Sequence, residues 1–315
     1  MIKLFSNIFE HSHSGQFKYP KALLKEAIER AVDGTDPRLR MMRGYAKTLR
    51  GPVLHAIDHV VHLVESLPEA VPVSRDNFAN NPALASIFYS TERLEQIISR
   101  DAALREFRES KPHVHGPVNA VLAVRKKEKH VVGIAMVDGE MRKDVAKTTI
   151  SFHQHRFVDP AQSEDETQRL LMRRLFDRLL GIALSRLVER QQERKDLAAR
   201  KALLKCKLDV MERSGSLNDQ AIAGERGQLQ MRMEDIEQQL SALGPDQAVL
   251  STNLAIIAEM LGRAERYLWL EETSICLDRY YVLQSQPSPS VPKITFHEFH
   301  DGKQDGILAL IVKNC

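Results

Sequence analysis

Histidine and carboxylate side chains recur at helical spacing near residue 60. His55, Asp58, His59 and His62 are separated by steps of three, one and three residues. At about 100° per residue they share one stripe of a helix, opposite an apolar face. Imidazole and carboxylate ligands suit zinc, iron, nickel or manganese. The stripe is therefore the best candidate in the chain for a divalent transition-metal site.

A polar face that contacts solvent or a partner explains the same stripe, and we favour this interpretation. Metal sites usually take ligands from several elements at a recognised spacing, whereas the stripe contains neither His-Glu-x-x-His nor Glu-x-x-His. His153 and His155 form a second pair of interest. Alternate residues of a strand project to one face, where two imidazoles can share a metal.

Basic residues supply a second kind of candidate site, for the phosphates of nucleic acid. Residues 169–213 hold thirteen Lys or Arg against six Asp or Glu, and residues 214–275 hold four against ten. These near-equal and opposite charges favour pairing between the two segments over nucleic-acid binding. No aromatic residue between 177 and 266 offers a stacking surface for bases. The candidate phosphate contacts are Arg190, Arg194 and Arg200 in the first segment and Arg38, Arg40, Arg43 and Lys47 in a short helix after Asp36-Pro37.

Other catalytic and cofactor signatures are absent from the sequence. It contains no Gly-x-Gly-x-x-Gly, no Gly-x-x-x-x-Gly-Lys-Ser/Thr and no Gly-x-Ser-x-Gly, which excludes these nucleotide-binding loops and the nucleophile elbow. Three widely spaced cysteines exclude a disulfide framework and a thiolate zinc site, and they suit a reducing compartment. No run of 18 apolar residues is present. We therefore expect a soluble, cytoplasmic, non-enzymatic protein with no membrane span.

The elements that must position these residues change character along the chain. The first 116 residues have helical apolar spacing, and Gly51-Pro52 is expected to end one helix and begin the next, at 52–67, which carries the histidine stripe. Short apolar segments at 118–124, 131–137 and 148–155 predict a three-stranded meander, with Asp138-Gly139 at a tight turn. Strand-like segments return at 273–283, 293–299 and 307–312. The economical arrangement joins both sets in one antiparallel sheet of about six strands.

The segment between the two sets of strands has the clearest periodicity in the chain. Its apolar residues are seven, four and three apart in the first part and four, three, four and three apart in the second, as in coiled-coil seams. A Gly- and Ser-containing turn at 214–218 separates the parts, so we predict an antiparallel coiled-coil hairpin. Its predicted interface residues are Leu197, Leu204, Leu208, Met211, Leu229, Met233, Ile236, Leu240 and Leu243.

Together these patterns predict an α+β fold in three parts. They are a helical domain at 1–116, an antiparallel β domain formed by 117–160 plus 267–315, and an inserted coiled-coil hairpin at 161–266. An exposed coiled coil is a device for contacting a partner protein or a second copy. Our leading hypothesis is a non-enzymatic protein–protein interaction or assembly protein that presents a coiled-coil arm. The alternatives are a nucleic-acid-associated protein that uses the basic arm or the 38–50 helix, and a histidine-rich metalloprotein.

Overall fold

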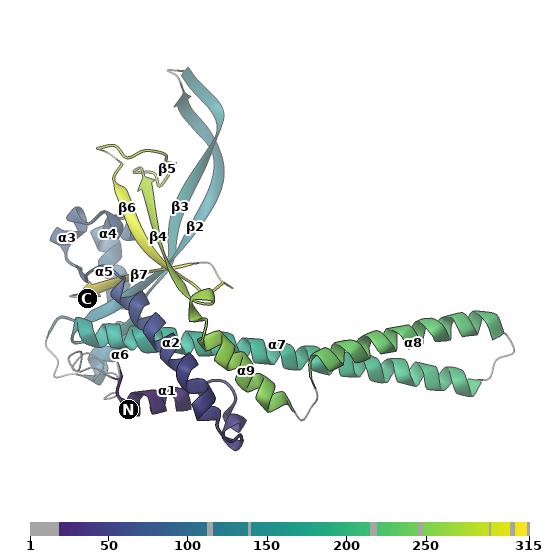
Figure 1. Cartoon of the computed structure of the whole chain (residues 1–315). Coiled ribbons are helices and arrows are strands. Elements are labelled where there is room, and N and C mark those ends of the chain that lie inside the picture. Colours follow the sequence, from purple (N-terminus) through teal and green to yellow (C-terminus); the bar gives the residue numbers. More distant parts are fainter. Residues whose placement is uncertain are drawn as a thin grey trace. The chain divides into compact units, whose positions relative to one another are not determined.

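The computed structural model describes residues 19–111, 116–137, 140–214, 219–244, 248–289, 291–302 and 306–313 (Figure 1). It combines helices with a mainly antiparallel sheet, which confirms the predicted α+β class. No helix in these ranges is both long enough and apolar enough to cross a bilayer.

The described residues divide into two compact units. One, called here the sheet unit, takes its residues from Ile57–Phe176 and Ala264–Cys315, and the other, the helical unit, is Tyr19–Ala56 with Asp177–Arg263. Helices α2 (Tyr45–Glu65) and α7 (Glu164–Ser214) each contribute residues to both units. The three-domain division made from the sequence stays a prediction.

The sheet joins strands from both ends of the sheet unit's sequence. Its order is β3-β2-β7-β6-β4-β5, so β7, from the end of the chain, lies between β2 and β6. These pairings are antiparallel, whereas the short β1 pairs with β7 in parallel. The strands are β1 (Val71–Pro72), β2 (Asn119–Val137), β3 (Glu140–Ala161), β4 (Trp269–Leu277), β5 (Leu283–Gln284), β6 (Lys293–His300) and β7 (Ile307–Lys313).

The predicted three-stranded meander is wrong, because β2 runs unbroken through the charged segment 125–129 and pairs with one long partner, β3. Lys127 and Lys129 project into solvent, whereas Lys126 forms an ion pair with Glu298, and none of these side chains disturbs the backbone hydrogen-bond ladder. A charge run therefore need not end a strand. The turn expected at Asp138-Gly139 lies outside the described residues.

Four short helices cover one face of the sheet: α3 (Arg75–Asn80), α4 (Pro82–Phe88), α5 (Thr91–Arg100) and α6 (Ala102–Ser110). Each begins at a side chain that accepts a hydrogen bond from a backbone N–H of its first turn, which stabilises the helix start. These caps are Ser74, Asn81, Ser90 and Asp101. Buried side chains from the helices and from alternate positions of β2, β3, β6 and β7 form one core, which includes Leu84, Phe88, Leu104, Leu122, Phe152, Phe296 and Leu308.

The helical unit contains α1 (Lys21–Asp33), the 3₁₀ helix η2 (Pro37–Met41), α8 (Asp219–Ala242) and α9 (Val249–Leu261), with parts of α2 and α7; the short η4 (Ala264–Arg266) follows in the sheet unit. The prediction that Gly51-Pro52 separates two helices is wrong, because α2 continues through Pro52. An internal proline costs about 3 kcal/mol. Leu49 and Val53 are fully buried around it, and burial of such side chains at about 1.5–3 kcal/mol each offsets that cost.

Candidate functional site

The helical unit contains a long pair of antiparallel helices, formed by residues 187–214 of α7 and by α8 (Figure 1). We call this pair the arm. Along α7 the buried side chains Leu187, Leu197 and Leu208 alternate with half-buried ones at 190, 194, 201, 204 and 211. The least exposed positions of α7 therefore recur at steps of three and four residues, facing α8.

Helix α8 shows the matching pattern. Leu229 is buried, and Met233, Ile236 and Leu240 are half-buried between exposed neighbours. Leu243, just beyond the helix end, is also half-buried. The nine residues that the sequence assigned to a seam are thus among the least exposed positions in this part of α7 and α8.

Polar contacts fix the direction and register of the two helices. Lys201 Nζ lies 2.9 Å from Glu237 Oε1, and Arg226 Nη2 lies 2.7 Å from Glu212 Oε1. The contact nearer the start of α7, at residue 201, involves the later residue of α8, and the contact at 212 involves the earlier one. The helices are therefore antiparallel.

Two arginines that the sequence offered as phosphate contacts are engaged within the arm. Arg190 Nη2 donates to the carbonyl of Leu243 at 2.7 Å, and Arg194 Nη1 donates to that of Gly244 at 2.6 Å. The last carbonyls of a helix lack partners in the helix itself and favour nearby cations. These guanidinium groups therefore cap the end of α8.

A second apolar stripe lies on the face of α7 that is turned away from α8. Ala199, Leu203, Cys206 and Val210 are separated by four, three and four residues, and all four are exposed. Leu203 is 58% exposed and Val210 65%. The sequence analysis missed this stripe: its spacing is visible in the sequence, but its exposure depends on which face of α7 packs against α8.

One member of the histidine stripe of α2 has a hydrogen-bond partner in the sheet unit. His59 Nε2 lies 2.7 Å from the carbonyl oxygen of Leu268. Within the described ranges, no three His, Cys, Asp or Glu side chains are grouped so as to hold a metal ion. Metal binding by His55, Asp58, His59 and His62 stays a prediction.

The pair His153 and His155 does not share a strand face, so that expectation is wrong. Ala123 pairs with Arg156 while Arg125 pairs with His153, which leaves an extra residue in β3 and breaks the alternation. His153 Nε2 lies 2.8 Å from Ser151 Oγ, whereas His155 Nε2 lies 2.9 Å from the carbonyl of Ile87 in α4. Burial lowers the pKa of the His155 imidazole below its usual value.

Two of the basic residues near 38–50 form ion pairs with carboxylates of the helical unit. Arg38 pairs with Asp36 at 2.9 Å, and its hydrogen bonds hold the pKa of that carboxyl below its usual value. Arg40 pairs with Glu29 at 3.0 Å and Asp33 at 2.7 Å. The remaining candidates, Arg43, Lys47 and Arg200, are exposed, and their contact with nucleic acid stays a prediction.

The sheet unit contains a buried ion pair that the sequence analysis missed. The Glu298 carboxylate, 6% exposed, lies 2.6 Å from Lys126 Nζ, whose side chain is 13% exposed. His300 Nε2 lies 3.8 Å from the same carboxylate, and its ring stacks on Trp269 with centroids 5.6 Å apart. The sequence did contain a signal for this pair: Glu298 lies two residues from Phe296, so it shares the buried face of the strand.

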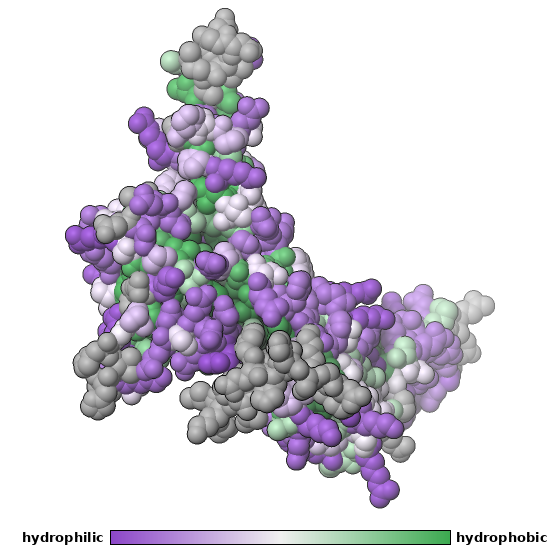
Figure 2. All heavy atoms as spheres, turned by 60° about the vertical axis from the view of Figure 1, so that its left-hand side comes forward, coloured by the Kyte–Doolittle hydropathy of each residue, from purple (hydrophilic) through white to green (hydrophobic). Residues whose placement is uncertain are grey.

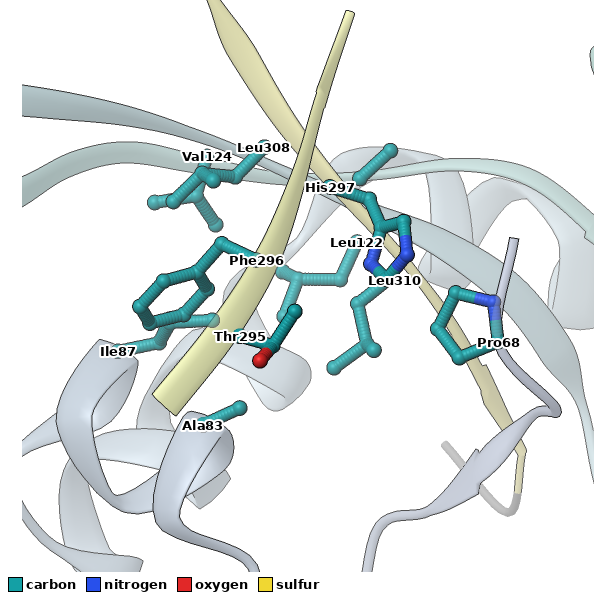
Figure 3. A pocket seen from close by; sticks show the side chains of 11 residues that line it. Pro68, Ala83, Ile87, Leu122, Val124, Thr295, Phe296, His297, Leu308 and Leu310 are labelled. Carbon is teal, nitrogen blue, oxygen red and sulfur yellow. The ribbon is translucent and has the colours of Figure 1, made fainter. Parts of the chain in front are cut away.

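The close-up in Figure 3 shows a small cavity where β6 and β7 diverge beyond their two paired positions. His297 lies beside Leu310 and Pro68 at its edge. The cavity volume is about 30 Å³, which is room for about one water molecule. A substrate of ordinary size does not fit there.

Comparison with known proteins identifies no relative: no family model, no curated protein and no solved structure matches this chain.

Proposed function

We propose that this protein is a non-enzymatic assembly protein whose arm is an antiparallel coiled coil that docks on the arm of a second copy. The observation that carries the proposal is the exposed stripe Ala199, Leu203, Cys206 and Val210 on the face of α7 opposite the seam. The seam holds the arm together, and the stripe is the surface that the second copy covers.

The coiled-coil assignment rests on the seam itself. Least-exposed positions at alternating steps of three and four are the mark of helices that pack knobs into holes. Lys201 and Glu237 add an ion pair beside the apolar contacts. A two-helix hairpin of this length buries one side of each helix and leaves the outward sides available for other contacts.

The chemistry of the stripe suits a third helix. Ala199 and Cys206 are small and let a neighbouring helix approach closely, while Leu203 and Val210 supply apolar surface that gains free energy when water is removed. From Ala199 to Val210 the helix rises about 16 Å, which is three turns of contact. Four-three-four spacing matches the spacing of a helix seam.

The charge of the arm favours a second copy as the occupant. Residues 187–213 hold eight Lys or Arg against five Asp or Glu, and residues 219–244 hold two against five. The excesses are equal and opposite, so the arm as a whole is neutral. Two arms therefore approach without the net repulsion that a uniformly basic arm would meet.

Sedimentation velocity of the full chain over a range of micromolar concentrations tests the proposal. We expect a monomer–dimer equilibrium that Leu203→Glu/Val210→Glu weakens by at least about 100-fold, because two carboxylates must then be desolvated at the contact. The matched control is Val132→Glu/Ile134→Glu, which changes two exposed apolar residues of β2 and should leave the equilibrium unchanged.

Thiol reactivity gives an independent readout. Cys206 is exposed and Cys276 is buried, so in a Cys315→Ser background iodoacetamide should modify Cys206 first. Its alkylation should slow as the concentration rises through the dimer range. A chain that stays monomeric, or equal effects of the stripe and control variants, would refute self-association through this stripe.

A further inference from the structure

Strands β2 and β3 continue beyond their pairing with β7 (Figure 1). Strand β3 makes one further bridge, between Thr149 and Val282, and past it the two strands run on as a two-stranded ribbon. Strand β7 pairs with β2 only from Asn119 to Arg125, whereas β2 and β3 stay paired as far as Val137 and Glu140. We call residues 125–137 and 140–153 the ribbon. It forms the upper projection in Figure 2, with both hydrophilic and hydrophobic side chains exposed along it.

The two faces of the ribbon differ in charge. Between 125 and 133 the register is regular, so alternate cross-strand pairs share a face. One face, called here the basic face, carries Arg125 with His153, Lys127 with Ser151, Lys129 with Thr149, Val131 with Lys147, and Gly133 with Val145. These ten residues include four Lys or Arg and no Asp or Glu.

The opposite face is anchored at its base. Phe152 and Ile150 are buried in the core of the sheet unit, and Lys126 is paired with Glu298. This packing turns the basic face outward, where Lys127 and Lys129 are exposed. Their positive charges are left for an external ligand.

Lys147 lies flat across the same face. Its Nζ donates to the carbonyl of Ile134 at 2.5 Å, and a Cβ at Gly133 would come within 3.3 Å of its Cδ. The glycine therefore makes room for the lysine stem, which carries the third charge alongside the other two. Within the described part of the chain, no carboxylate pairs with Lys127, Lys129 or Lys147.

We propose that the basic face binds the phosphate backbone of double-stranded DNA, with the ribbon seated in the major groove. A two-stranded ribbon has strands about 4.8 Å apart and fits a B-form major groove about 12 Å wide. Same-face lysines on a strand stand about 6.7 Å apart, so several reach the phosphates along one wall. The contact is electrostatic and independent of sequence.

Duplex DNA fits this surface better than the other polyanions. The major groove of A-form RNA is deep and too narrow for protein side chains. A membrane surface is flat and can contact only one face of the ribbon. The exposed apolar residues Val132 and Ile134 lie on the face opposite the lysines. The lysines and the apolar side chains therefore cannot contact an anionic membrane at the same time.

Fluorescence anisotropy with a labelled 30-base-pair duplex between 50 and 200 mM salt tests the proposal. The variant Lys127→Gln/Lys129→Gln/Lys147→Gln removes three phosphate contacts and should lower the slope of log affinity against log salt by about 2.7. Over this fourfold change in salt, the wild type should then lose about 40-fold more affinity than the variant. The double variant Lys127→Gln/Lys129→Gln should lower the slope by about 1.8. Because both positions are exposed, this variant should fold even if the triple variant does not.

The matched control is Arg93→Gln/Arg100→Gln/Arg156→Gln. These arginines line an open groove beside α5 and β3 in the same unit, and their loss removes the same charge from another place. It should leave the slope unchanged. The proposal is overturned if the wild type does not bind DNA, if the control lowers the slope as much as the ribbon variant, or if RNA duplexes or anionic vesicles bind as tightly as DNA.

Discussion

Replacing Lys126 by Met should destabilise the sheet unit strongly, because it leaves a carboxylate buried without its cation. Lys126 Nζ and Glu298 Oε1 are 2.6 Å apart, which at an effective dielectric constant of about 20 corresponds to roughly 6 kcal/mol of gross attraction. Desolvation consumes part of it. Loss of one partner of a buried pair nevertheless costs about 3–5 kcal/mol, because the other charge stays buried.

The reverse substitution should cost less. In Glu298→Gln the lysine keeps Glu128, whose Oε1 lies 3.6 Å from Lys126 Nζ, and its flexible stem can carry the ammonium to water. The double variant Lys126→Met/Glu298→Gln should be more stable than Lys126→Met alone, since no charge remains to be paired. The two changes are thus expected to be strongly non-additive.

Urea denaturation followed by circular dichroism measures these differences, supported by thermal unfolding. The sheet unit spans about 170 residues, a size at which 1 kcal/mol shifts Tm by about 2–4 °C, so Lys126→Met should lower Tm by about 6–20 °C. The control is Lys201→Met, which breaks an ion pair whose side chains are 40% and 49% exposed and should cost less than about 1 kcal/mol. A cost below 1 kcal/mol for Lys126→Met, or additive effects in the double variant, would refute the reasoning.

Three further predictions use the same unit. Gly306→Ala should cost about 1–3 kcal/mol in urea denaturation, because the new Cβ would lie 2.5 Å from His300 Cε1, and adding His300→Ala should restore part of the loss. Asp101→Ala should cost about 2–3 kcal/mol, because this carboxylate caps α6 and also accepts a hydrogen bond from the backbone of β3; Asp101→Asn, which keeps the capping oxygen, should cost less. Burial, with a neighbouring tyrosine, raises the pKa of Tyr281 to about 12, so ultraviolet titration should show a late phenol ionisation that Tyr281→Phe removes. Because the folded pKa lies above the unfolded one, stability should fall as pH rises from about 10 towards 12, and a variant that keeps the late step would contradict the assignment.

The helical content and the seam positions followed from local spacing alone. Residues three and four apart meet on one side of any helix, so the periodicity of 197–211 and 229–243 was visible before any tertiary contact was known. The same rule placed His55 and His59 on one stripe. It could not show that the carbonyl of Leu268 meets His59, because that contact joins positions about 200 residues apart.

Sequence rules for where a helix or strand ends were less reliable where tertiary contacts stabilised its continuation. Pro52 and the charged segment 125–129 both suggested breaks, yet α2 and β2 run through them. In the first case buried neighbours offset the lost hydrogen bond. In the second, Lys127 and Lys129 meet solvent on one face while Lys126 pairs with Glu298 on the other, so the backbone ladder stays intact.

The sequence by itself determined which residues can share a helix or strand face, because that depends only on the period of the backbone. Tertiary structure alone decided which faces meet. It brings Lys126 to Glu298 across the sheet, Arg190 and Arg194 to the carbonyls just after α8, and Lys127, Lys129 and Lys147 to the outer face of the ribbon. Strand register and helix pairing join residues far apart in the chain, and the burial they produce decides whether a charge is neutralised inside the protein or presented to a ligand.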